Sequence, residues 1–113
     1  LGEEMGNEDY RRGRGYTMIN KYMSSGGHLA GRRTISAEDM TNTYLVFTAT
    51  LEFLKLGSDH SVFSGITHSV FHGFNYSPPE APFPGWIRYG AYYNENNTWW
   101  PYLRHFMDYK GRL

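Results

Sequence analysis

Hydrophobic residues at helical spacing mark two segments in the first half of the chain. The first stripe comprises Tyr16, Ile19, Tyr22 and Met23. The second comprises Tyr44, Phe47, Leu51 and Leu54. Each stripe falls on one face of an α-helix, and glycines at Gly26-Gly27 and at Gly57 follow them. We therefore expect one helix from about residue 16 to 25 and another from about residue 41 to 56.

Two short runs between these patterns predict strands. Residues 33–38 have strand-compatible residues at their centre, and residues 66–72 are β-branched and aromatic, bounded by Gly65 and Gly73. A long irregular stretch from residue 73 to about 96 follows and contains four of the five prolines. Thr98 can cap a last helix, with Pro101 in its first turn, that runs towards Lys110.

The order of these elements predicts an α/β fold with parallel strands joined by right-handed crossovers. Two strands and three helices cannot cover the edges and both faces of a parallel sheet. The pattern thus predicts a piece of a larger α/β domain.

Composition narrows the classes of function. The 113 residues carry 11 basic and 11 acidic side chains, so the formal charge is zero, which argues against a general nucleic-acid binder or a polybasic membrane-surface module. No apolar run approaches the roughly 20 residues that span a bilayer, and no signal peptide is visible. The absence of cysteine excludes a disulfide scaffold, a thiolate metal site and a cysteine nucleophile.

Ligands of α/β folds bind at the carboxyl ends of the strands, and two residues stand at such ends here. Glu38 closes the first strand and His72 closes the second. Glu38 is a candidate general acid or base, or a sugar or metal ligand. Alternatively, Glu38 or Asp39 caps the following helix, and Asp39 is the favoured cap.

His68 and His72 are four residues apart, a spacing that would suit zinc on a helix. On a strand they share a face but lie about 13 Å apart, which disfavours a shared ion. We therefore predict no metal site, with His72 as a hydrogen-bond partner for a ligand and His68 in the core. No glycine-rich phosphate loop and no Gly-x-Ser-x-Gly elbow is present.

The long loop contains further candidates. Glu80 and Glu95 could supply a second carboxylate, although loop glutamates are usually solvated. Trp86, Trp99 and Trp100 could form a platform that stacks on a sugar, because rings with polar tips beside amides suit polyhydroxylated ligands. The alternative is that these rings pack the loop and the last helix, which we expect for one of the Trp99-Trp100 pair.

Three motifs, in order, resemble glycoside hydrolase family 106, the α-L-rhamnosidases. They are Ser36-Ala37-Glu38 with Thr41, the run from Ile66 to Pro78 that contains Thr67-His68-Ser69-Val70-Phe71-His72, and Pro84-Gly85-Trp86 with Gly90 and Asn97-Thr98-Trp99-Trp100. The resemblance covers roughly residues 30 to 113. The loop from Ser77 to Phe83 differs from the family pattern.

The resemblance implies a fragment of a (β/α)8 TIM-like barrel, with about two βα units, a long βα loop and a following helix. Residues 1–113 would then be a partial catalytic barrel domain of a larger protein. The implied activity is inverting hydrolysis of terminal α-L-rhamnosides of plant polysaccharides or glycosides. Calcium assists sugar binding in some members, and the setting would be periplasmic or extracellular.

Carried onto this sequence, the resemblance makes Glu38 an active-site carboxylate. Substrate-binding residues would be His72, Asn75, Tyr76, Trp86 and Glu80. The partners would be a rhamnose-containing glycan and the remainder of the barrel, with no nucleic acid and no membrane. No cofactor is evident in the segment itself, and we expect the isolated chain to be inactive.

Two other functions remain open at this point. The aromatic loop over residues 73–100 could serve a non-catalytic carbohydrate-binding or structural module. A metal-dependent hydrolase that uses His68 and His72 would bind zinc stoichiometrically.

Overall fold

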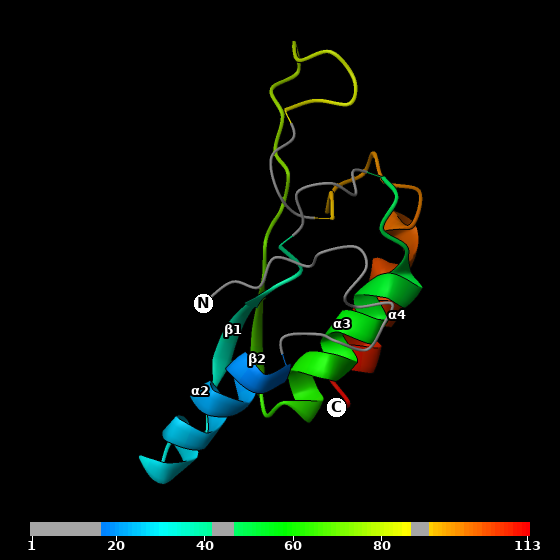
Figure 1. The fold of residues 1–113 in the computed structure, drawn as a ribbon. Helices are drawn as coiled ribbons and strands as arrows, with labels where there is room; N and C mark the ends of the chain where they lie inside the picture. The colour runs from blue at the N-terminus through cyan, green and yellow to red at the C-terminus, as the bar shows by residue number, and fades with distance from the viewer. Residues whose placement is uncertain (1–16, 42–46, 87–90) are drawn as a thin grey trace.

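The computed structural model describes residues 17–41, 47–86 and 91–113, and it has an α/β architecture (Figure 1). In chain order the elements are α2 (Thr17–Leu29), β1 (Ser36–Asp39), α3 (Leu51–Phe63), β2 (His68–Phe71), the 3-10 helix η1 (Trp100–Tyr102) and α4 (Leu103–Lys110). The α/β class and the order of the elements are confirmed. These elements are compatible with a fragment of a barrel, and the barrel itself stays a prediction.

The two strands form a parallel sheet, as the sequence predicts. Ser36 pairs with His68, and Asp39 at the other end of β1 pairs with Phe71. The backbone N–H of His72 donates to the carbonyl of Asp39 at 2.9 Å and extends the pairing by one residue. Both strands therefore end side by side, which places the residues that follow them at one edge of the sheet.

Alternation along β1 separates its two faces. Ala37 and Asp39 are buried, whereas Ser36 is exposed and Glu38 is partly exposed. In β2, His68 and Val70 are exposed, and Val70 is the register partner of Glu38. One face of the sheet thus packs on the helices, and the face that carries Glu38 is open to solvent.

The core lies between the buried sheet face, α3, α4 and the segment before η1. Figure 1 shows α3 and α4 beside each other, on the other side of the molecule from the strands. The largest cluster of buried side chains comprises Met40, Ala49, Leu54, Ala91, Tyr93, Trp99 and Phe106. The indole N–H of Trp99 donates to the carbonyl of Ala49 at 2.7 Å and ties the C-terminal segment to the residues before α3.

Helix α2 differs from its prediction at its end and in its buried face. It continues through Gly26-Gly27 to Leu29, and the absence of a side chain at Gly27 leaves room for Ile35, whose Cδ1 would lie 2.2 Å from a Cβ there. The predicted apolar face is exposed over Ile19, Tyr22 and Met23, and Tyr16 lies outside the described residues. Instead the polar residues Asn20 and Ser24 are buried.

Helix α3 begins and ends later than predicted. Phe47 has φ 57°, which is incompatible with a right-handed helix, and Tyr44 lies outside the described residues. Thr50 caps the helix, since its hydroxyl accepts a hydrogen bond from the N–H of Phe53 at 3.1 Å. Gly57 is buried inside the helix and does not end it.

The C-terminal helix begins as a 3-10 turn that contains Pro101, close to the predicted start. Thr98 does not cap it: Trp99 holds the cap position and makes no side-chain capping bond. Among the described residues, no helix is long and apolar enough to cross a membrane.

Candidate active site

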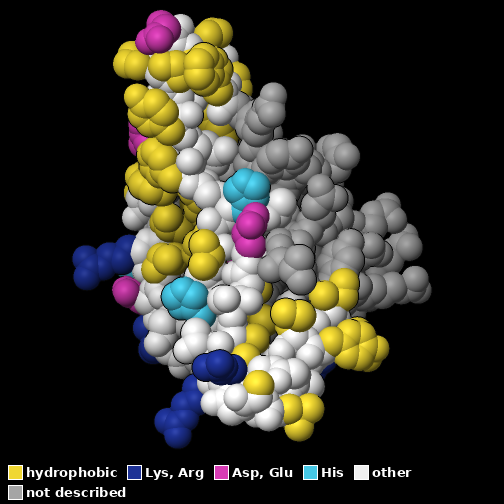
Figure 2. All heavy atoms as spheres, turned by 90° about the vertical axis from the view of Figure 1, so that its left-hand side faces the viewer, with side chains coloured by type: hydrophobic (Ala, Val, Ile, Leu, Met, Phe, Trp, Pro, Cys, Tyr) yellow, Lys and Arg dark blue, Asp and Glu magenta, His cyan; other side chains and the backbone are white. Residues whose placement is uncertain are grey.

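Glu38, Thr41 and His72 form a cluster at the carboxyl ends of the two strands. Nδ1 of His72 lies 2.8 Å from Oε1 of Glu38. The hydroxyl of Thr41 donates to the same carboxylate oxygen at 3.0 Å and lies 3.1 Å from Nδ1 of His72. The Glu38 side chain is 44% exposed and that of His72 is 38% exposed, so solvent reaches the pair. Figure 2 shows a histidine ring beside an acidic side chain on this face.

Counting hydrogens defines the arrangement within the cluster. Thr41 has one hydroxyl hydrogen, and if it donates this hydrogen to Glu38 its oxygen can accept from Nδ1–H of His72. Nδ1 of His72 also lies within hydrogen-bond distance of Oε1 of Glu38, so a proton on Nδ1 can be shared between the Thr41 hydroxyl and the Glu38 carboxylate. Oε1 of Glu38 is thus held by two donors, and the carboxylate is oriented.

Local backbone geometry brings Thr41 back to the strand end. Met40 has φ 66°, a left-handed conformation that turns the chain immediately after β1. Met40 itself is buried in the core cluster, which anchors the turn. The Ser-Ala-Glu-x-x-Thr spacing of the sequence therefore serves a contact between its glutamate, Glu38, and its threonine, Thr41.

Asp39 plays a different part from the predicted one. It is the last residue of β1, is 3% exposed and caps no helix among the described residues, because Thr50 caps α3. Its carboxylate accepts hydrogen bonds from Ser61 at 2.8 Å and from Ser69, and Nζ of Lys110 lies 3.6 Å away. The prediction of a cap is wrong, since alternation along the strand turns this carboxylate into the core.

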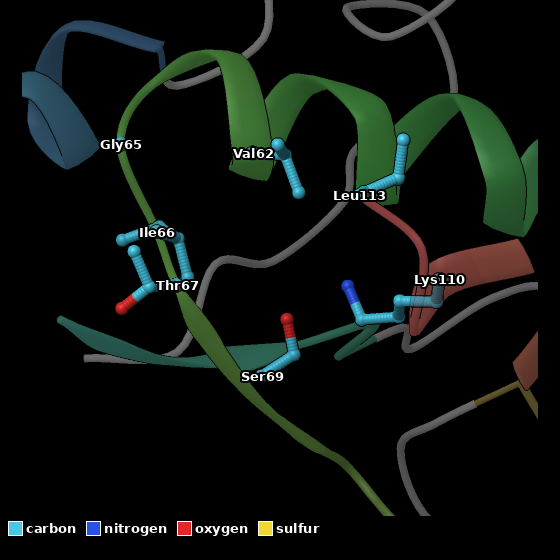
Figure 3. A pocket seen from close by; sticks show the side chains of 7 residues that line it. All are labelled: Val62, Gly65, Ile66, Thr67, Ser69, Lys110 and Leu113. Atoms are coloured by element: carbon cyan, nitrogen blue, oxygen red, sulfur yellow. The ribbon is translucent and has the colours of Figure 1, made fainter. Parts of the chain in front are cut away.

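A pocket of about 250 Å³ adjoins this buried ion pair. Figure 3 shows Ser69 of β2 and Lys110 of α4 pointing towards each other, with Val62 of α3 above them. Burial lowers the pKa of Lys110, although the charge of Asp39 acts in the opposite direction. Burial, and secondly Asp39, raise the pKa of the Tyr93 hydroxyl. These groups join the strands to the helices rather than face the open side of the sheet.

The predicted substrate-binding residues of the loop divide into two groups. Asn75 is engaged in the fold, because its Oδ1 accepts from the N–H of Tyr93 at 3.2 Å and its carbonyl accepts from the Asn94 amide at 2.8 Å. Tyr76, Glu80 and Trp86 are exposed. Their role in substrate binding stays a prediction.

A second pocket, of about 580 Å³, lies between this loop and residues 94–96. Asn75 and Tyr76 line it together with Phe74 and Phe83, whereas Glu80 and Trp86 are not among its described lining residues. Hydrophobic side chains gather over the upper part of the face drawn in Figure 2.

Several predicted roles lie elsewhere. Trp99 is buried in the core, as expected for one of the two adjacent tryptophans, and Trp100 packs edge-on against Phe74. His68 is exposed, so its predicted place in the core is wrong: it projects from the open face of β2. Gly90 of the third motif lies outside the described residues.

Metal ligation finds no support among residues 17–41, 47–86 and 91–113. These residues contain no group of three or more His, Asp or Glu side chains that could hold an ion. The family resemblance implies calcium in some members. In the described part of this chain, no such cluster of side chains is present to bind it.

Sequence reasoning missed Thr41 as a member of the cluster and Lys110 as the partner of Asp39. Thr41 was visible only as a motif position. Lys110 carried no local signal, because its contact with Asp39 joins the last residue of α4 to the last residue of β1.

Comparison with known proteins assigns the class. The profile of glycoside hydrolase family 106, described as alpha-L-rhamnosidase, matches residues 3–113, and the chain belongs to this family. A curated protein of Formosa agariphila named "Putative beta-glucuronidase" is 33% identical over 93 residues, which are 81% of this chain and 8% of that protein. The chain therefore spans a small part of that relative's length. No solved structure matches.

Proposed function

We propose that this chain supplies an active-site carboxylate, Glu38, to a glycoside hydrolase that cleaves terminal α-L-rhamnosides. The observation that carries the proposal is the position of Glu38: it stands at the carboxyl end of β1, on the solvent-facing side of the sheet, with Oε1 held by Thr41 and His72. Membership of the family supplies the reaction class. The partners would be a rhamnose-containing glycan and the remainder of a barrel.

The proposed reaction is hydrolysis with inversion by two carboxyl groups, about 6.5–9.5 Å apart. One protonates the leaving oxygen, and the other removes a proton from the attacking water. Glu38 would take one of these roles through Oε2, because Oε1 already accepts two hydrogen bonds. Asp39 is not the second carboxylate, since it points to the opposite face of the sheet and is paired with Lys110.

His72 and Thr41 would orient Glu38 rather than react. Fixing one carboxylate oxygen restricts rotation of the group and leaves the other oxygen available for the reaction. His72 is also half exposed, so its ring could contact a sugar bound beside Glu38.

Substitution of Glu38 tests the proposal. In the full-length protein we expect Glu38→Gln to lower kcat on an aryl α-L-rhamnoside about 10²–10⁴-fold, the contribution typical of a positioned acid or base. Glu52→Gln, an exposed glutamate in the first turn of α3, is the matched control and should retain turnover. Unchanged turnover by Glu38→Gln would refute the assignment.

A second candidate is carbohydrate binding without hydrolysis. The observation that favours it is the loop over residues 74–86, where Phe74, Tyr76, Phe83 and Trp86 are all exposed. In that case the wild-type protein would bind a rhamnose-containing oligosaccharide and release no rhamnose from it, and Glu38→Gln would leave the affinity unchanged.

A further inference from the structure

The loop pocket has a wall of aromatic rings that the fold leaves in solvent. Tyr76 is 73% exposed and Phe83 is 77% exposed, and both line the pocket together with Phe74. Burial of such a ring removes about 150–250 Å² from water. A contiguous group of exposed rings marks an interaction surface.

The loop is held in shape by its own hydrogen bonds. The N–H of Ala81 donates to the carbonyl of Pro78 at 3.0 Å, and that of Gly85 donates to the carbonyl of Pro82 at 2.8 Å. The hydroxyl of Ser77 accepts from the N–H of Trp86 at 2.8 Å and so closes the base of the loop.

Gly85 allows this closure. It has φ +95°, and a Cβ there would lie 2.3 Å from the Ser77 hydroxyl and 2.9 Å from the Tyr92 hydroxyl. A residue larger than glycine would therefore collide with Ser77 and Tyr92 at position 85. Asn75 then ties the loop to Tyr93 and Asn94 at the other side of the pocket. A pocket with this many internal restraints loses little conformational entropy when a ligand binds.

The chemistry of the pocket suits one ring of a neutral sugar chain. Rings offer apolar faces to the C–H faces of a pyranose, and the exposed residue Asn96 lines the same pocket and carries an amide that matches a hydroxyl. The amides of Asn75 and Asn94 also lie at the pocket, where they hold the loop in place through their own hydrogen bonds. Glu95 also lines it, and its negative charge opposes the carboxylate of a uronic acid.

The pocket is joined to the candidate active site by a very short piece of chain. His72, which contacts Glu38, is separated from Phe74 of the pocket by one residue. Two residues span at most about 7 Å of chain, so the Phe74 end of the pocket lies close to the candidate active site. A substrate that extends beyond the sugar at Glu38 in this direction would meet the aromatic wall.

We propose that this pocket is a second sugar subsite that binds the uncleaved neutral residue of an oligosaccharide, so that the preferred substrates are rhamnose-terminated oligosaccharides rather than small aryl glycosides. The inference rests on the proposed function. Phe83 and Tyr76 contact the uncleaved sugar, and Glu95 disfavours a uronic acid at this position.

The test compares two substrates in the full-length protein. Phe83→Ala should lower kcat/KM about tenfold for a neutral rhamnosyl-glucose disaccharide, while kcat/KM for 4-nitrophenyl α-L-rhamnoside stays within about twofold. Phe63→Ala is the matched control, because Phe63 is also 77% exposed and lies at the end of α3, outside the pocket lining. Its values should equal those of the wild type on both substrates.

Charge selection gives a second readout. The wild type should prefer the neutral disaccharide to rhamnosyl-glucuronic acid by about tenfold or more, and Glu95→Gln should reduce that preference. Equal losses on both substrates by Phe83→Ala, or no loss on the disaccharide, would overturn the subsite.

Failure of the proposed function is separable from failure of the subsite. If the wild type cleaves no rhamnoside, the hydrolase assignment falls, and calorimetric titration with the neutral disaccharide decides the subsite. Weaker binding by Phe83→Ala and unchanged binding by Phe63→Ala support the subsite. Equal affinities for all three proteins refute it.

Discussion

Removal of the Asp39 carboxylate should destabilise the chain far more than removal of a surface carboxylate. Asp39→Ala deletes the acceptor for Ser61 and Ser69 and leaves the Lys110 ammonium without its anionic partner. Lys110 retains Ser58 at 3.3 Å, and its side chain is 15% exposed. Breaking a buried ion pair costs about 3–5 kcal/mol of the free energy of unfolding. Because Lys110 keeps its contact with Ser58, we expect a loss of about 3 kcal/mol for Asp39→Ala.

Guanidinium unfolding of the 113-residue chain measures this loss. Trp99 is buried in the core and donates to Ala49, so its fluorescence reports unfolding. Asp39→Asn keeps a hydrogen-bond acceptor and should lose about half as much as Asp39→Ala. The control is Asp108→Ala, whose exposed carboxylate lies 4.0 Å from Arg104 and should contribute less than about 0.5 kcal/mol.

The result that would refute this reasoning is a loss for Asp39→Ala no greater than that for Asp108→Ala. Such a result would mean that the buried pair gains no more from its contacts than it loses in hydration. A double variant, Asp39→Ala with Lys110→Met, should recover part of the loss because it removes the uncompensated ammonium.

Two further outcomes follow from the structure. In the full-length protein, Thr41→Val should lower kcat on an aryl rhamnoside about threefold to tenfold with little change in KM. Thr41→Ser should keep kcat near the wild-type value, because serine retains the hydroxyl that donates to Glu38. Loss of kcat by both variants would contradict the orienting role. Burial acts to raise the pKa of Asp59, but hydrogen bonds from Lys55 and Tyr109 outweigh it and hold that pKa below its ordinary value of 3.8. The folded state therefore gains stability from Asp59 above about pH 4 and loses it as the pH falls through the folded-state pKa, so Asp59→Asn should reduce the difference between guanidinium midpoints at pH 7 and pH 3. An unchanged difference would exclude Asp59 as a source of the acid sensitivity.

The parallel strand pair was predictable because both runs are short, carry strand-forming residues and are separated by a helical pattern. The same argument brought Glu38 and His72 to one edge of the sheet, and they lie 2.8 Å apart there. Parallel pairing makes the two ends coincide, so no long-range information was needed.

Other features depend on contacts that a local pattern does not contain. The exposed apolar stripe of α2 looked like its buried face, yet the polar residues Asn20 and Ser24 pack inward, and Ser24 donates to the carbonyl of Ser64 at 2.8 Å. Gly65 makes this approach possible, because a Cβ there would lie 2.7 Å from Ser24. The start of α3 depends on the left-handed backbone at Phe47, which hydrophobic spacing does not reveal.

The adjacent carboxylates Glu38 and Asp39 lie on opposite faces of β1, so that only the correct register of the strand pair satisfies both of them. A slip of one residue would turn Glu38 into the core and Asp39 towards solvent, since alternate residues exchange faces. Lys110, Ser61 and Ser69 would then meet a side chain one methylene longer in a site shaped for aspartate. Misaligned chains would thus lose the buried ion pair and the oriented glutamate together. Any chain that retains the Asp39–Lys110 pair should also present Glu38 on the open face of the sheet.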